Sequence, residues 1–434
     1  MKMANMDDYF DVVIVGTGAA GLYCALNLPA RYRILLLTKQ KADESDSFLA
    51  QGGICMQHGE ADYRPFFDDT MRAGHYENNP ATVDLMIRSS NSIIRDLVRR
   101  GVRFARDENG ALRFTREGAH SRARILFHED ITGREITQTL LAEVLRCENI
   151  ELRENTVMLD FFADAAACGG VVAMGPDGAV RAIGAGAVVL ACGGIGGLYK
   201  NSTNYPHITG DAIAMALRHG VACRHLDYIQ IHPTTLYSHR KGRRFLISES
   251  VRGEGALLLD KNGNRFTNEL QPRDVVSAAI RAQMEKDGTD HVWEDMRPIG
   301  EAAIREHFPN ILERCEEEGY DPIHEPIPVV PAQHYFMGGI AADLSSRTAL
   351  PRLYACGETC CNGVHGRNRL ASNSLLESLV FARKAADDMI FGQTPEYVRA
   401  DAIDMNMYES REELLNACHE TVLKEIERMK KSHE

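Results

Sequence analysis

The sequence predicts an α/β protein with a Rossmann-like nucleotide-binding domain, an inserted α+β domain and a short C-terminal helical tail. Three observations predict this fold. Residues 10–39 follow the pattern strand, glycine loop, helix, strand. Residues 187–194 form a second buried strand pattern that runs into a glycine turn. Between residues 228 and 331 histidines, arginines and polar turns replace this βα rhythm, which indicates an insertion.

The first glycine loop predicts a dinucleotide site. An apolar β-branched run, residues 12–15, leads into the loop and a helical pattern follows it. Gly16 permits the tight turn, Gly18 lets backbone amides approach a pyrophosphate, and Gly21 brings the helix close to the strand. The pyrophosphate then lies at the positive end of the helix.

Length and composition are those of a globular protein that is large enough for two or three domains. The chain has 434 residues, of which 44% are hydrophobic and 25% charged. A net charge of −12 disfavours a nucleic-acid partner. No apolar run reaches membrane-spanning length and the N-terminus lacks the apolar core of a signal peptide, so we expect a cytoplasmic protein without a membrane partner.

The eleven cysteines form no regular framework. Cys356, Cys360 and Cys361 are clustered, but a second pair is missing and His365 alone does not complete a metal site. We therefore expect no metal and no disulfide.

The coarse organisation divides the chain into four parts. Residues 1–226 and 331–394 are expected to form the nucleotide-binding domain, and residues 227–330 the inserted domain. Residues 395–434 are charged and helical in pattern, with room for one or two helices.

The cofactor expected at the glycine loop is FAD rather than NAD. A nicotinamide dehydrogenase usually has an acidic residue at the end of the second strand, where this chain has Thr38-Lys39-Gln40. Three separated glycine-rich pieces, residues 16–21, 192–197 and 357–366, suggest a long cofactor held by both ends of the chain.

Seven motifs occur in one order across residues 10–392. They are Ala50-Gln-Gly-Gly53, Gln230-Ile-His-Pro-Thr234, Glu249-Ser-Val-Arg-Gly-Glu-Gly255, Pro272-Arg-Asp274, Ala332-Gln-His-Tyr-Phe-Met-Gly-Gly339, Gly357-Glu358, and His365-Gly-Arg-Asn-Arg369 with Ser372-Asn-Ser-Leu375. Together they resemble the succinate dehydrogenase/fumarate reductase flavoprotein family. The resemblance implies a Rossmann-like FAD-binding domain with an inserted α+β capping domain that closes over the flavin.

Within the family, two features are similar to the members that oxidise L-aspartate. Relatives with covalent FAD carry a histidine just before the Ala50–Gly53 motif, but residues 44–49 contain none, which implies non-covalent FAD. The segment Thr115–Ser121, with Arg124–Leu126 and Thr132–Glu135, is similar to the segment in which a glutamate matching Glu117 faces the substrate amino group. An ammonium in a dicarboxylate site needs such a counter-charge. The alternative is that Glu117 is a solvated loop acid.

The resemblance also implies the groups that bind and convert a dicarboxylate. The clamps for the two carboxylates are Arg369, His232 and His334, with Thr234 and Gln230 nearby; an arginine fork suits a carboxylate. The alternative for each histidine is a structural hydrogen-bonding role.

Arg273 stands where the family places its catalytic arginine, and Glu249 is the expected relay acid, so the catalytic set is Arg273, Glu249 and His232. An ordinary arginine is a poor proton donor. Its role is therefore either proton passage within a preorganised cluster or electrostatic stabilisation of the reacting substrate. The alternative is a surface ion pair with Asp274.

On the cofactor side, the resemblance assigns the loop to the pyrophosphate, Lys39 to the adenosine and Ser47–Gly53 to the isoalloxazine. Glu358 would accept the ribose hydroxyls, and the helix start at Ser374 and Leu375 would face the flavin pyrimidine edge. The complete expected set is Gly16, Thr17, Gly18, Ala19, Ala20, Gly21, Lys39, Ser47, Phe48, Leu49, Ala50, Gln51, Gly52, Gly53, Asp211, Glu358, Ser374 and Leu375.

The activity implied by the resemblance is oxidation of L-aspartate to iminoaspartate, with hydride passing from Cα to flavin N5. Oxygen or fumarate would reoxidise the flavin, and quinolinate synthase would consume the product in bacterial NAD biosynthesis. Two alternatives remain: a soluble fumarate reductase or succinate-oxidising flavoprotein, and a non-catalytic flavin-binding paralogue.

Overall fold

The main sheet has seven strands and carries the first glycine loop at its centre. The structure is a computed structural model and describes residues 9–164, 167–240, 242–392, 403–408 and 410–433. The strand order is β6-β2-β1-β9-β8-β7, and β16 also pairs with β9. The bounds are β1 Tyr9–Val15, β2 Ile34–Leu37, β6 Ile150–Arg153, β7 Val157–Ala163, β8 Cys168–Met174, β9 Val180–Leu190 and β16 Leu353–Ala355.

Parallel and antiparallel pairing divide this sheet. Strands β6, β2, β1, β9 and β16 run parallel, whereas β8 pairs antiparallel with both β9 and β7. The eleven-residue strand β9 pairs with β8 in its first half and with β16 in its second. All four residues of β2 are buried, as expected of a parallel strand covered on both faces. The expected α/β class is confirmed.

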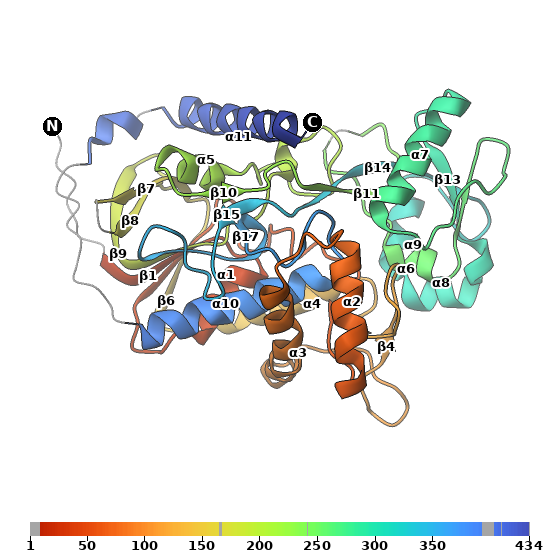
Figure 1. Ribbon diagram of the computed structural model, residues 1–434, viewed down its shortest axis with the longest axis horizontal. Helices are drawn as coiled ribbons and strands as arrows, with labels where there is room; N and C mark the ends of the chain where they lie inside the picture. Colours follow the sequence, from red (N-terminus) through yellow and green to blue (C-terminus); the bar gives the residue numbers. More distant parts are fainter. Residues whose placement is uncertain (1–8, 165–166, 241, 393–402, 409, 434) are drawn as a thin grey trace.

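Helices cover both faces of the main sheet (Figure 1). One face packs against α1, α3, α4 and α10, and alternate strand residues such as Ile14 and Leu36 point into that core. The other face, with Val13 and Leu35, packs against α5 and α11. The helix bounds are α1 Ala19–Asn27, α2 Tyr63–Ala73, α3 Pro80–Arg100, α4 Thr132–Val144, α5 Asp211–Arg218, α10 Asn373–Phe391 and α11 Arg411–His433.

A second, antiparallel sheet lies to one side of the molecule (Figure 1), with the order β11-β14-β13-β12. Its apolar cluster, from Leu236 to Val329, is separate from the cores of the main sheet. This part agrees with the expected α+β insertion; the exact boundaries at residues 227 and 330 stay a prediction. The elements are β11 Ile229–Leu236, α6 Glu249–Gly253, β12 Leu257–Leu259, α7 Arg273–Asp287, β13 Val292–Asp295, η3 Arg297–Ile299, α8 Glu301–His307, α9 Pro309–Glu317 and β14 Ile327–Phe336.

Two three-stranded sheets and short 3₁₀ turns connect these parts. One sheet has the order β3-β5-β4 and the other β10-β15-β17. The bounds are β3 Ile54–Cys55, η1 Glu60–Asp62, β4 Phe114–Thr115, β5 Ile125–Leu126, η2 Gly196–Leu198, β10 Cys223–Arg224, β15 Gly339–Ala341, η4 Gly357–Thr359, β17 Cys360–Cys361 and η5 Met405–Tyr408.

The C-terminal tail forms the long helix α11 after the short turn η5, as expected of one or two helices; residues 395–402 lie outside the described residues. Cys418, Val422 and Ile426 on α11 are buried against the α5 side of the main sheet. The tail is therefore packed onto the nucleotide-binding part.

All eleven cysteines are unpaired, and burial raises the pKa of the Cys24 and Cys192 thiols to about 12. Across the described ranges, no group of three or more histidine, cysteine or acidic side chains could hold a metal ion. In the same ranges, no helix is both long and apolar enough to cross a bilayer.

Candidate active site

One long pocket brings together the motifs that are scattered along the chain. All three glycine-rich pieces contribute to its wall, together with the inserted sheet and α10. Most of the sequence-predicted residues line it. Four do not: Ala19, Gly21, Gln230 and Thr234.

The glycine loop is held by close backbone packing. Gly16 has φ +115°, and a Cβ there would lie 2.0 Å from the Ala191 carbonyl oxygen. A Cβ on Gly21 would lie 1.9 Å from the Gly16 carbonyl oxygen. Gly16 and Gly21 therefore hold strand and helix together, whereas Gly18 borders the pocket beside Ser47. The Ala19 amide donates to the Ser47 hydroxyl at 3.1 Å, so the loop and the Ser47–Gly53 segment are in direct contact.

Lys39 and Asp211 contact each other at one end of the pocket. The Lys39 ammonium lies 2.6 Å from Asp211 Oδ2 and 3.0 Å from the His207 carbonyl oxygen. Both residues line the pocket, at the end where the resemblance places the adenosine. Asp211 also begins α5, so its carboxylate lies at the positive end of that helix.

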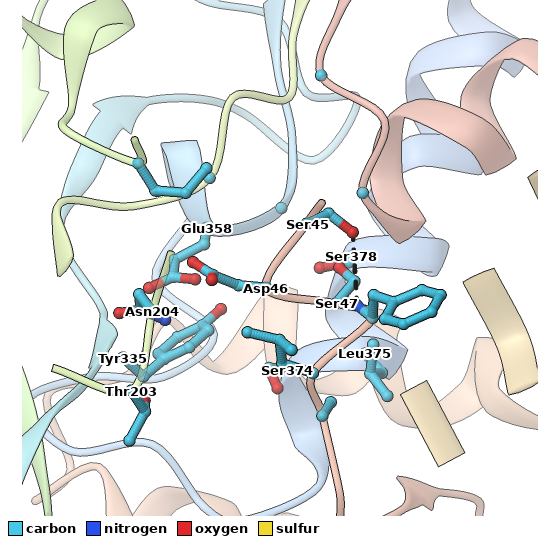
Figure 2. Close-up of a pocket in the computed structure, with 18 of the residues that line it drawn as sticks. Ser45, Asp46, Ser47, Thr203, Asn204, Tyr335, Glu358, Ser374, Leu375 and Ser378 are labelled. Carbon is cyan, nitrogen blue, oxygen red and sulfur yellow. Dashed lines mark hydrogen bonds between the residues drawn. The ribbon is translucent and has the colours of Figure 1, made fainter. Parts of the chain in front are cut away.

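Two half-buried acids, Glu358 and Asp46, face the same space (Figure 2). Glu358 Oε1 accepts the Phe336 amide at 2.8 Å, and burial followed by the nearby Asp46 raises the pKa of Glu358 to about 8. Asp46 Oδ1 accepts the Tyr205 amide at 2.8 Å, and burial raises its pKa to about 7. Asp46 Oδ2 is buried without a partner. The sequence motifs did not single out Asp46; its position inside the residue 44–53 loop was the available signal.

Histidines and arginines meet at the opposite end of the pocket. The His232 and His334 rings pack edge to face with centroids 5.1 Å apart. Burial first, and then the charge of Arg273, hold both pKa values well below the usual histidine range, so both rings are neutral. Cationic charge at this end therefore comes from Arg273 and Arg369, and the histidines act through hydrogen bonds.

The tautomer of His232 decides what it offers to the pocket. Its Nδ1 lies 2.9 Å from the Thr234 carbonyl oxygen and 3.2 Å from the Thr234 amide nitrogen. Its Nε2 is buried without a protein partner. When Nδ1 accepts the amide hydrogen, Nε2 carries the proton and can donate to a carboxylate; when Nδ1 donates to the carbonyl oxygen, Nε2 can only accept.

Gln230 lies behind the two arginines and joins them. Its side-chain oxygen accepts from Arg273 Nη1 at 2.9 Å and from Arg369 Nε at 3.3 Å. Its amide nitrogen donates to Asn368 Oδ1 and the Arg369 carbonyl oxygen, each at 2.8 Å. Gln230 and Thr234, predicted to contact substrate, are thus placed outside the pocket wall, because these bonds turn the Gln230 side chain toward the arginines. The Thr234 hydroxyl donates to the Ile247 carbonyl oxygen at 3.2 Å.

Arg273 is buried and pairs with Glu249. Its Nε lies 2.5 Å from Glu249 Oε2, and the two side chains are 8% and 5% exposed. The alternative partner, Asp274, instead contacts His75 at the surface at 3.1 Å. Arg273 begins α7 and Glu249 begins α6, so two helix starts of the inserted part direct this pair into the pocket.

Glu117 is buried in the same pocket rather than solvated, with 4% exposure. Its Oε2 accepts the Ser372 hydroxyl at 2.7 Å and its Oε1 accepts the Ser250 hydroxyl at 3.1 Å. Burial, and then the charge of Glu249, raise the pKa of Glu117. Sequence reasoning missed both serines as partners of this acid.

Ser374, Arg369 and Leu375 mark the N-terminal end of α10 at the pocket. The Arg369 Nη1 donates to the Ser374 hydroxyl, and burial followed by Arg273 lowers the pKa of Arg369 to about 10. Arg369 thus stays cationic at neutral pH. The nineteen-residue helix behind Ser374 directs its unpaired amides toward the pocket wall.

The comparisons with known proteins agree with this geometry. The FAD binding domain family model matches residues 11–375. The E. coli quinol fumarate reductase FrdA structure is similar at a TM-score of 0.83 and 31% identity, with 96% of this chain and 74% of that chain covered. The fold and the pocket therefore define a flavoprotein of the succinate dehydrogenase and fumarate reductase class.

Proteins that are similar to this chain in sequence identify its family within this class. L-aspartate oxidase of Clostridium perfringens is 49% identical, with 87% of this chain and 85% of that protein covered. L-aspartate oxidase of Clostridium acetobutylicum is 47% identical, with 87% of each covered. The chain belongs to the L-aspartate oxidase family.

The pocket fits FAD, which is the cofactor of this flavoprotein. The loop at Gly16 and Gly18 forms part of the pocket wall, and the missing side chain of Gly18 leaves space beside Ser47 for a pyrophosphate. Asp46 Oδ2 and Gln51 Oε1 are buried pocket acceptors without protein partners, as expected where a polar ligand completes the hydrogen bonds. Lys39, Glu358 and the α10 start would hold its other parts.

Proposed function

We propose that the protein oxidises L-aspartate to iminoaspartate with FAD as its electron acceptor. The observation that carries this proposal is the burial of Glu117 in the pocket that also holds Arg273, Arg369, His232 and His334. The Glu117 carboxylate would neutralise the substrate ammonium, and the arginines and histidines would bind the two substrate carboxylates. The naming of the relatives as L-aspartate oxidases supports the same activity.

The carboxylates of the substrate would be bound by the two arginines and the two histidines. Gln230 holds the two guanidinium groups together from behind, so that neither has to be ordered when substrate binds. The neutral histidines add hydrogen bonds without adding charge. This set accepts a four-carbon dicarboxylate, and it does not by itself distinguish aspartate from succinate or fumarate.

Glu117 would supply that distinction. A buried carboxylate stabilises an ammonium ion, because its counter-charge and charge-assisted hydrogen bond replace the water that the ammonium loses on binding. The same carboxylate repels a dicarboxylate that lacks the ammonium. Glu117 therefore favours L-aspartate over succinate when it is ionised.

Arg273 and Glu249 would stabilise negative charge on the substrate and take part in proton transfer. Oxidation of L-aspartate to iminoaspartate removes two electrons and two protons from the Cα–N unit. FAD, when bound, accepts the two electrons and so makes this oxidation possible. The buried Arg273–Glu249 pair stabilises negative charge on the substrate carboxylates, and the proton relay that the resemblance implies for Glu249 would pass through this ion pair. The inserted sheet and its helices form part of the wall at this end of the pocket, and water would be displaced there when substrate binds.

The acceptor that reoxidises the flavin would be oxygen or fumarate, since the substrate site already fits a four-carbon dicarboxylate. Iminoaspartate hydrolyses in water, so an enzyme that consumes it directly, such as quinolinate synthase in NAD biosynthesis, would be the natural next step.

The experiment that tests the proposal is anaerobic mixing of the purified yellow protein with L-aspartate. We expect the flavin absorbance to bleach with L-aspartate and to persist with succinate. Bleaching by succinate alone would overturn the proposal.

A second candidate is a soluble fumarate reductase or succinate-oxidising flavoprotein. The fold similarity to the E. coli quinol fumarate reductase favours it, because the two chains are alike over 96% of this one. Bleaching by succinate without bleaching by L-aspartate would support this activity. The buried Glu117 argues against it, since that acid weakens the binding of a plain dicarboxylate.

A further inference from the structure

The carboxylate of Glu117 is held by two hydroxyl groups that come from different parts of the fold. Ser372 precedes α10 in the nucleotide-binding part, and Ser250 lies on α6 in the inserted part. One hydroxyl reaches each carboxylate oxygen, at 2.7 Å and 3.1 Å. The inference below rests on the proposed function, in which Glu117 receives the substrate ammonium.

Ser372 is built for this contact and not for capping its own helix. It stands at the N-cap position of α10, where a serine side chain usually accepts a backbone amide of the first turn. Its hydroxyl makes no such bond. It accepts the Gly53 amide at 3.2 Å instead, so its single hydrogen is free to go to Glu117.

The backbone of Ser372 also has an unfavourable conformation. Its φ is +61°, in the left-handed region that costs a non-glycine residue free energy. A residue that forgoes its capping bond and accepts this cost is expected where the side chain is needed elsewhere. Here that need is the orientation of Glu117.

Ser250 links Glu117 to the inserted part. Its backbone amide donates to the Ser248 hydroxyl at 3.3 Å, which fixes the first turn of α6. The neighbouring Glu249 bonds Arg273 from the same turn. The first turn of α6 therefore directs the Glu249 side chain to Arg273 and the Ser250 side chain to Glu117.

Two glycines let the backbone pass close to the two carboxylates. A Cβ on Gly52 would lie 2.6 Å from Glu117 Oε1, and a Cβ on Gly118 would lie 2.4 Å from Glu249 Oε1. Backbone thus passes directly against both acids. The orientation of Glu117 is set by this contact together with the two hydroxyls.

We propose that Ser250 and Ser372 are positioning residues that orient the ionised Glu117 and so set the preference for L-aspartate over dicarboxylates without an amino group. Both donate hydrogen bonds that stabilise the carboxylate form in a fully buried place. Because Ser250 belongs to the inserted part, the complete ammonium site exists only when that part is seated on the pocket.

The test compares Ser250→Ala and Ser372→Ala with the wild type. We expect kcat/KM for anaerobic flavin reduction by L-aspartate to fall about 10- to 100-fold in each, as for loss of one hydrogen bond to a charged group. The acid limb of its pH profile should move toward higher pH, because the carboxylate form has lost a donor. Ser250→Thr keeps the hydroxyl and should restore most of the rate.

Succinate binding provides a readout that does not need turnover of L-aspartate. Succinate should bind more tightly as Glu117 takes up a proton, so its dissociation constant, followed by the flavin spectrum, should show an inflection with pH. In both alanine variants this inflection should lie at higher pH. The dissociation constant of succinate at high pH should stay within about threefold of the wild-type value. The matched control Ser92→Ala, an exposed serine on α3, should match the wild type.

The possible results distinguish a failure of the proposed function from a failure of the positioning role of the two serines. A wild-type flavin that L-aspartate does not reduce would end the proposed function, and the succinate inflection would still report the positioning of Glu117. An unmoved inflection in both serine variants, or equal losses for aspartate and succinate in folded protein with full flavin content, would overturn the positioning role.

Discussion

At the residue scale, the site works through charges that the protein has buried and then partnered. Glu249 is buried, yet the neighbouring Arg273 and Arg252 keep its pKa below the usual glutamate value despite desolvation. Glu117 bonds two serine hydroxyls and no cation, and burial and the charge of Glu249 raise its pKa against the opposing charge of Arg273. The two acids therefore differ in what they can accept: Glu249 is already paired, whereas Glu117 is ready for a cation that arrives with the substrate.

The first prediction concerns Glu117→Gln. This change removes the charge and keeps the shape, so kcat/KM for L-aspartate should fall about 100-fold or more, as for a charged partner lost from a buried pair of roughly 3–5 kcal/mol. Succinate should bind at least as tightly as to the wild type. Stopped-flow flavin reduction and succinate titration measure the two effects.

The pH dependence of the wild type gives a related prediction. Since the pKa of Glu117 is raised and the ionised form binds the ammonium, kcat/KM for L-aspartate should decline as the pH falls through that raised pKa. The decline should begin at a higher pH than an ordinary glutamate would give. In Glu117→Gln this limb should disappear, and its persistence there would assign it to another group.

Arg273→Lys tests the geometry of the arginine cluster. A lysine keeps the positive charge and loses the fork that contacts Glu249 and Gln230 together. We expect kcat to fall about 100-fold or more with flavin content unchanged. Equal kcat values would show that charge alone suffices at this position.

At the element scale, helix starts place the Arg273–Glu249 pair and border the pocket. α6 begins at Glu249, α7 at Arg273 and α10 at Asn373, and each start lies beside the pocket. Helix starts are rigid and carry unpaired amides, so they direct side chains and attract anions at once. The tail helix α11 has a different role, because it packs against the face of the main sheet that also carries α5.

The packing of α11 gives an element-scale prediction with a matched control. Ile426 is 2% exposed within the sheet core, and Leu423 on the same helix is 42% exposed. Ile426→Ala should lower the free energy of unfolding by about 2–5 kcal/mol, and Leu423→Ala should change it by less than about 0.5 kcal/mol. Denaturant unfolding of the two variants measures this. Equal losses would mean that α11 is not packed as described.

At the scale of the whole molecule, one cofactor-sized pocket joins segments from both ends of the chain. The Gly16–Gly21 loop, residues 192–193 and residues 356–358 meet around it. Bound FAD therefore contacts parts that are far apart in sequence, and its binding free energy is also free energy of folding.

The attachment of FAD is tested at this scale. Residues 44–49 supply serines, an aspartate and apolar side chains but no histidine to the pocket, so we expect the flavin to be released when the protein is precipitated with acid. Absorbance of the supernatant measures the released flavin. A yellow pellet with a colourless supernatant would show a covalent bond.

Sequence reasoning reached the fold class, the glycine loop and most residues of the pocket wall, because these features depend on short local patterns. Gly16 and Gly21 are recognisable since both belong to one short loop pattern, although Gly16 also packs against Ala191. Arg273 and Glu249 were recognisable only through motifs. The positions of Gln230 and Thr234 were predicted less well, because a motif does not say which way a side chain points.

The sequence by itself determined which chemistry the chain carries: a nucleotide loop, paired arginines and histidines, and a glutamate in a dicarboxylate motif. Only the tertiary structure decided how these groups are used. Glu117 and Ser372 are 255 residues apart, and Glu117 and Ser250 are 133 apart, so no local pattern shows that they bond. Burial is likewise a property of the packed whole. A glutamate is an ordinary acid on a loop, and it becomes a selective ammonium site because distant segments remove the water around it and supply two hydroxyls in its place.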